Sequence, residues 1–71
     1  MDVNRLKMMV IQIDQNIAFA GPKAEVIATH LRKFWTPQMR KDIYQEIEKN
    51  PADFSQDVQA ALKLLHGEAK A

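Results

Sequence analysis

The sequence contains no cysteine among its 71 residues. The chain therefore cannot form a disulfide, and it has no thiolate with which to bind a metal. Its two histidines, His30 and His66, are isolated in the sequence and would need carboxylates to complete a metal site. Because a single domain of this size is near the lower limit for independent folding, its core must come from helix packing or from a partner.

A strong net charge and a long apolar run are also missing. The net charge is +1, whereas domains that bind nucleic acid mainly through electrostatics are usually much more basic. No apolar run approaches the ~20 residues that a membrane-spanning helix needs. Residues 1–5 lack the basic and apolar regions that open a signal peptide. We therefore expect a cytoplasmic protein whose partners include neither nucleic acid nor a membrane.

Catalytic patterns are sparse as well. The two glycines, Gly21 and Gly67, are too few and too far apart for a phosphate-binding loop. Ser55 is the one serine, and no histidine or acid lies at a spacing that indicates a nucleophile. Asp42 and Glu46 form an i,i+4 acidic pair, which is ordinary on a helix surface. We predict no catalytic, cofactor-binding or metal-binding residue and no enzymatic activity from the isolated chain.

What the sequence does contain is helical periodicity. Apolar residues recur at three- and four-residue spacing, which predicts an all-α fold with three main helices and a shorter last one. We expect one domain over residues 1–71, with helices at about 3–19, 22–35, 37–49 and 55–66. Gly67 is expected to end the last helix and to leave residues 67–71 as a frayed tail.

A sharp corner is predicted where the second and third helices meet. The residue before a proline is pushed out of the helical region, so the second helix should stop at Trp35. Thr36 can then cap the third helix, and Pro37 suits its first position because no N–H is needed there. We expect Phe34 to pack into the core and Trp35 to be only partly covered. Leu31 is expected to be a core residue.

The same corner is a candidate surface for binding another protein. Arginine and tryptophan dominate many protein interfaces, and no acid occurs between Glu25 and Asp42. Apolar residues on the first helix that project away from its main stripe form a second candidate. The predicted partner-binding residues are His30, Arg32, Trp35, Pro37, Met39 and Arg40 at the corner, and Met8, Ile11 and Phe19 on the first helix. Both features also have a structural explanation, as a core anchor and as a helix enclosed by its own bundle.

Three classes of function are compatible with these residues. The first is an accessory subunit of a larger complex, because the chain shows potential docking surface and no chemistry. The second is a helix-turn-helix protein whose third helix reads nucleic acid, although Asp42, Glu46 and Glu48 would repel phosphates. The third is a self-associating helical regulatory module, which would include a homodimer of the isolated chain.

The stretch IATHLRKFWTPQMR at residues 27–40 adds a family resemblance. It resembles the signature of the delta subunit family of soluble NAD-dependent formate dehydrogenases, in which FW-x-P-x-MR is the most specific element. The tail DVQAALKLL at residues 57–65 is similar to the closing pattern of that family. The resemblance covers nearly the whole chain.

The resemblance implies an accessory subunit without cofactors of its own. In that family the alpha subunit carries a molybdenum or tungsten pterin cofactor and iron–sulfur clusters. The beta and gamma subunits pass electrons through FMN and further clusters to NAD. The role implied for this chain is assembly or stabilisation of the complex, or cofactor retention, and the implied partner is the catalytic alpha subunit.

Overall fold

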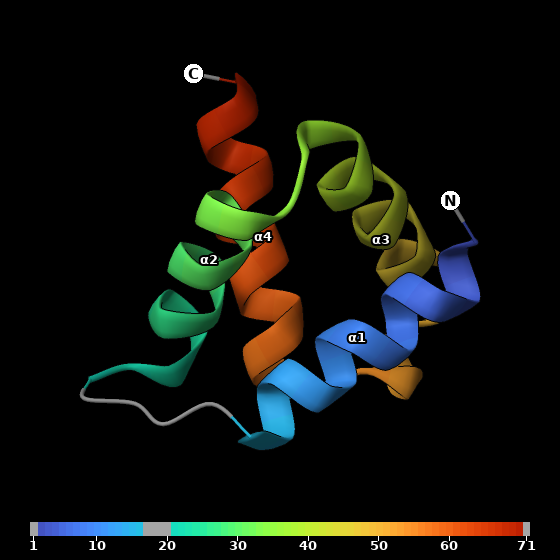
Figure 1. Ribbon diagram of the computed structural model, residues 1–71, viewed down its shortest axis with the longest axis horizontal. Coiled ribbons are helices and arrows are strands. Elements are labelled where there is room, and N and C mark those ends of the chain that lie inside the picture. The colour runs from blue at the N-terminus through green and yellow to red at the C-terminus, as the bar shows by residue number, and fades with distance from the viewer. Residues whose placement is uncertain (1, 17–20, 71) are drawn as a thin grey trace.

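Four α-helices make up the fold (Figure 1). They are α1 (Val3–Asn16), α2 (Lys23–Phe34), α3 (Pro37–Lys49) and α4 (Gln56–Lys70), with a 3-10 helix, η1 (Pro51–Asp53), between α3 and α4. The computed structural model describes residues 2–16 and 21–70, with side chains up to residue 68. No strand occurs in these ranges, so the predicted all-α class is confirmed. None of the helices described is both long and apolar enough to cross a membrane.

Helix α4 is the element against which the other three pack (Figure 1). Its most extensive contact is with α2, while α1 and α3 contact both α4 and each other. The prediction of a shorter last helix is therefore wrong, because α4 has 15 residues, more than any other helix has within the described residues. The chain brings its C-terminal helix into the centre of the bundle.

The N-terminal ends of α3 and α4 are each capped by a hydroxyl side chain, and the cap of α3 is the one that the sequence predicts. Thr36 Oγ1 accepts a hydrogen bond from the N–H of Met39 at 3.2 Å, and Pro37 is the first residue of α3. Ser55 Oγ accepts from the N–H of Val58 at 3.2 Å in the same way. Each cap satisfies a backbone donor that has no partner inside its own helix.

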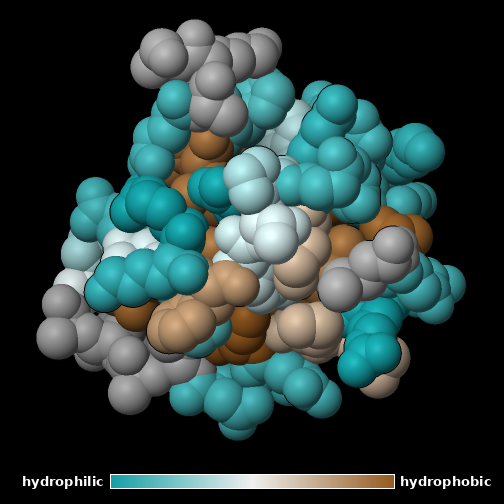
Figure 2. Space-filling view, turned by 45° about the horizontal axis from the view of Figure 1, so that its top comes forward, coloured by the Kyte–Doolittle hydropathy of each residue, from teal (hydrophilic) through white to brown (hydrophobic). Residues whose placement is uncertain are grey.

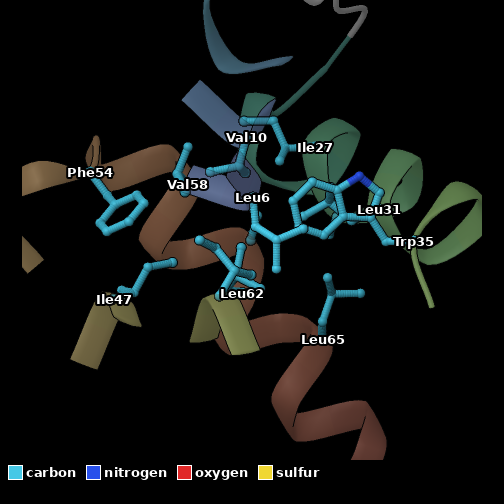
Figure 3. Packing of buried hydrophobic residues seen from close by; sticks show 13 residues of the cluster. Leu6, Val10, Ile27, Leu31, Trp35, Ile47, Phe54, Val58, Leu62 and Leu65 are labelled. Carbon is cyan, nitrogen blue, oxygen red and sulfur yellow. The ribbon is translucent and has the colours of Figure 1, made fainter. Parts of the chain in front are cut away.

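Most large hydrophobic side chains lie inside this arrangement. On the face that Figure 2 shows, the hydrophobic areas are separated from one another by hydrophilic side chains. The buried cluster draws on all four helices and on the end of η1 (Figure 3). It consists of Leu6, Val10, Ile27, Ala28, Leu31, Trp35, Ile43, Ile47, Phe54, Val58, Ala61, Leu62 and Leu65. Leu31 is fully buried, as expected.

The exposures of the two aromatic residues at the α2–α3 corner are the reverse of the prediction. Trp35 is only 6% exposed and its indole points into the core (Figure 3), whereas the Phe34 side chain is 70% exposed. Helix α2 ends at Phe34, and Trp35 has extended backbone angles, φ −101° and ψ 143°. Helical spacing places a side chain correctly only while the chain stays helical, so it fails at this first residue after the helix.

The C-terminal end of α4 also differs from the prediction. The helix continues through Gly67 to Lys70, so Gly67 does not end it and the expected frayed tail at 67–70 is helical. Gly67 has no positive φ, which a glycine that ends a helix usually adopts. One further expectation, that α1 continues from Asn16 to residue 19, lies outside the described residues.

The two glycines predict opposite effects of substitution by alanine. Gly67→Ala should raise the free energy of unfolding by about 0.5–1 kcal/mol, because glycine is a poor helix former and the added Cβ meets no atom within 4 Å. Gly21→Ala should lower it by at least about 1 kcal/mol, because Gly21 has φ +136°. Urea denaturation followed by circular dichroism measures both. A destabilising Gly67→Ala would contradict a helix that continues through this residue.

Candidate partner-binding surface

The α2–α3 corner does not form one continuous surface. Trp35 belongs to the core and cannot contact a partner while the chain keeps this fold. His30 and Arg32 lie on α2, whereas Pro37 and Arg40 lie on α3. The residues predicted at the corner therefore divide into one buried residue and two separate surface regions.

The outer face of α2 is the first of these regions. His30 is half-buried, and its ring centroid lies 4.8 Å from that of the exposed Phe34, at an interplanar angle of 43°. Both rings line a shallow hollow of about 440 Å³ together with Val26 and Lys33. Phe34 gives this face its largest exposed apolar side chain.

Arg32 is already paired within the chain. Its Nε donates to Glu68 Oε1 at 2.8 Å, and its Nη2 donates to the other carboxylate oxygen. The pair joins α2 to the last turns of α4. Both side chains are well exposed, so the pair contributes little to stability. Arg32 would have to leave Glu68 before it could bind a carboxylate on a partner.

The second region is a groove between α3 and α4 of about 300 Å³. We call it the α3–α4 groove; its lining residues are Pro37, Arg40, Lys41 and Tyr44 of α3 and Leu62, Leu65 and His66 of α4. The rings of Tyr44 and His66 stack with their centroids 4.1 Å apart and their planes within 7°. The stack fixes both side chains, so this part of the groove has a defined shape.

Arg40 has an unusual environment in this groove. Its side chain is partly buried, and its Nε is fully buried without any hydrogen-bond acceptor in the described part of the chain. Ion pairs among the described residues involve Lys7, Lys23 and Arg32, and none involves Arg40. Buried donors are nearly always satisfied in native structures. Arg40 is thus a donor that lacks its acceptor.

The remaining predicted residues are less exposed than expected or cannot be placed. Met39 and Ile11 are partly buried and pack against the core. Met8 is 64% exposed, so the apolar outer face predicted for α1 is reduced to this one side chain among the residues described. Phe19 lies outside the described residues.

Sequence reasoning did not select several residues of these surfaces. It expected Phe34 in the core, and it did not connect Tyr44 or Lys41 with His66. The position of Tyr44 beside the apolar stripe of α3 was a signal, since an aromatic residue there must find another neighbour. No signal in the sequence pairs it with His66, because the stack depends on how α3 and α4 pack.

The described residues do not fit the metal cofactors of the complex that the resemblance implies. They contain no group of three or more His, Cys, Asp or Glu side chains placed to hold a metal ion. Iron–sulfur clusters are held mainly by cysteine thiolates, and the sequence has no cysteine. We therefore assign no residue of this chain to a metal or a cluster.

Comparison with known proteins supplies the family. The model of the family described as "NADH-dependant formate dehydrogenase delta subunit FdsD" matches residues 5–62. Comparison with curated proteins and with solved structures gave no match. The matched range includes α2, α3, the corner between them and all of the predicted signature at 27–40. The chain belongs to the family of formate dehydrogenase delta subunits.

Proposed function

We propose that this chain is a non-catalytic accessory subunit of a molybdenum- or tungsten-dependent, NAD-linked formate dehydrogenase. The family match over residues 5–62 is the observation that carries the proposal. The absence of cysteine is compatible with it, because the chain has no thiolate for electron-transfer clusters. The cytoplasmic location expected from the sequence belongs to the same proposal.

The proposed role is to bind other subunits and to act in assembly, stabilisation or cofactor retention. We propose the catalytic alpha subunit as the partner. Within the chain, the predicted residues with accessible side chains remain candidates for this contact. Met8, Pro37 and Arg32 are exposed, the last paired with Glu68, and His30 and Arg40 are partly buried. The helix-turn-helix alternative has no comparable support, and α3 carries Asp42 and Glu46 along its length.

Co-expression of the remaining formate dehydrogenase subunits with and without this chain tests the proposal. We expect the chain to co-purify with an affinity-tagged alpha subunit, and we expect less active holoenzyme when the chain is omitted. The readouts are gel filtration of the complex, its metal and pterin content, and its formate-oxidising activity. A complex that excludes this chain and is unaffected by its omission would contradict the proposal.

The same preparations separate the three roles. A role in assembly predicts less full-size complex on gel filtration when the chain is omitted. A role in stabilisation predicts a normal initial yield that is lost faster on dilution or heating. A role in cofactor retention predicts an intact complex whose pterin and metal content falls with time. The matched control is the same complex with the chain added back after purification.

A further inference from the structure

We propose that the α3–α4 groove binds an apolar segment of another formate dehydrogenase subunit, and that Arg40 donates to a carboxylate carried by that segment. The inference rests on the proposed accessory function. It adds the surface, the contacting residues and the chemistry of the partner.

The lining of the groove is cationic and contains no acid. Arg40 and Lys41 contribute positive charge, and its lining residues include neither Asp nor Glu. The nearest acids along α3 are engaged elsewhere in the chain. Asp42 Oδ1 accepts from Gln38 Nε2 at 2.8 Å, and Glu46 Oε1 accepts from Asn50 Nδ2 at 3.0 Å. Among the described residues, no carboxylate lines the groove, so it has room for one from outside this part of the chain.

Arg40 shows where that charge would bind. Only two buried side-chain polar atoms lack a hydrogen bond among the described residues, Asp14 Oδ1 and Arg40 Nε. The Asp14 oxygen has the ammonium nitrogen of Lys23 3.1 Å away, so its charge is compensated. Arg40 Nε has no such partner within the ranges that the structure describes. Because Nε itself is fully buried, a carboxylate from a partner would bind the two terminal nitrogens of Arg40, which are not among the buried atoms and have no acceptor among the described residues. The planar guanidinium matches a carboxylate well, and the charge of a bound carboxylate would also compensate the buried N–H.

The rest of the groove is lined mainly by apolar surface, so it fits an apolar side chain beside that carboxylate. Leu62, Leu65 and Pro37 supply aliphatic walls, and the Tyr44–His66 stack supplies a flat one. A volume of about 300 Å³ is at the lower limit for small-molecule sites. It suits one or two side chains inserted from a neighbouring protein, with a charged pair at the edge of an apolar contact.

Charge complementarity argues against a second copy of this chain as the occupant. Among the described residues, the exposed large apolar side chains are Met8, Phe34 and Leu64. On a helix, the residues that share a face with a given side chain lie three and four positions away. For these three side chains, such neighbours include one acid, Glu68, which already pairs with Arg32. The described part of a second copy would therefore offer the groove no unpaired carboxylate beside an exposed large apolar side chain. An apolar segment of another subunit that carries an Asp or Glu would bring the opposite charge.

The test measures binding of the purified chain to the purified complex of the other subunits by surface plasmon resonance. Arg40→Glu should weaken binding by at least about 30-fold, because the carboxylate loses its donor and meets a like charge. Arg40→Lys should fall between this variant and the wild type, because lysine keeps the charge and loses the fork. Lys63→Glu is the matched control: it makes the same charge change on α4, outside the groove, and should alter binding by less than about 3-fold.

Each outcome separates the inference from the proposed function. If the wild-type chain does not bind the other subunits, the proposed function fails. If the wild type binds and a folded Arg40→Glu binds equally well, the groove assignment fails and the proposed function stands. If the isolated chain forms a dimer that Arg40→Glu dissociates, the occupant is a second copy. Should Arg40→Glu lose its helical circular dichroism, Lys41→Glu at the exposed rim replaces it, with an expected loss of about 10-fold.

Discussion

Trp35→Ala is expected to lower the free energy of unfolding by about 3–5 kcal/mol, and Phe34→Ala by less than about 0.5 kcal/mol. The two residues are adjacent and both are aromatic, but Trp35 is 6% exposed and Phe34 is 70% exposed. Removing the indole would leave a large void between α2 and the rest of the core. The phenyl ring already faces water, so removing it would leave no such void.

Urea denaturation followed by circular dichroism gives both free energies. Trp35→Phe is the intermediate control, because it keeps an aromatic ring and removes only part of the volume. Similar losses for Trp35→Ala and Phe34→Ala would contradict the placement of these two rings. A larger loss for Phe34→Ala would restore the order that the sequence alone predicts.

Leu31→Ala is expected to lower the free energy of unfolding by about 2–5 kcal/mol. Leu31 is fully buried on α2 and lies in the core cluster with Leu62 of α4, so the truncated side chain leaves a cavity in the cluster. The matched control is Leu64→Ala, which deletes the same atoms from a side chain that is 44% exposed. This control should lose about 0.5 kcal/mol or less.

The size of the domain makes the Leu31 result decisive. A chain of this length typically has a stability of roughly 4–10 kcal/mol, so Leu31→Ala could be partly unfolded without denaturant. Low helical circular dichroism for Leu31→Ala, with a normal signal for Leu64→Ala, would therefore agree with the expectation. Equal stabilities for the two variants would show that Leu31 is not a core residue.

Much of this fold could be predicted from local sequence chemistry. The corner between α2 and α3 was predictable because a proline disfavours helix at the preceding residue and suits the first position of the next helix. Helix α3 has the predicted bounds, Pro37–Lys49. Its start depends on three consecutive residues, so it needs no knowledge of tertiary contacts.

Features that depend on packing or on weak local preferences could not be predicted in this way. Trp35 was misplaced because helical spacing does not apply beyond the last helical residue. Phe34 is that last residue, and helical spacing does not explain its exposure. Gly67 was expected to end α4, but one glycine lowers helix stability by only about 1 kcal/mol. The Arg32–Glu68 pair holds the turn that contains Gly67 to α2, and no local pattern predicts this contact.

The candidate site was predictable in part. Arg40 was selected because arginine is common in protein interfaces and no acid lies between Glu25 and Asp42; nothing in the sequence indicated that its Nε is buried. Tyr44 and His66 were not combined with it, since α3 and α4 place them together only in the folded chain. Trp35 was selected for its residue type, which is as common in cores as in interfaces.

The placement of the single tryptophan and the single tyrosine gives the protein two intrinsic optical probes. Trp35 lies in the core, so unfolding transfers its indole to water and should shift its fluorescence emission to longer wavelength. Tyr44 lies in the α3–α4 groove, stacked on His66, so a bound segment should perturb its absorption while the tryptophan emission stays unchanged. If the peptide ligand contains neither tryptophan nor tyrosine, one unlabelled sample distinguishes the two events. Occupation of the groove changes the tyrosine signal, and loss of the fold changes the tryptophan signal.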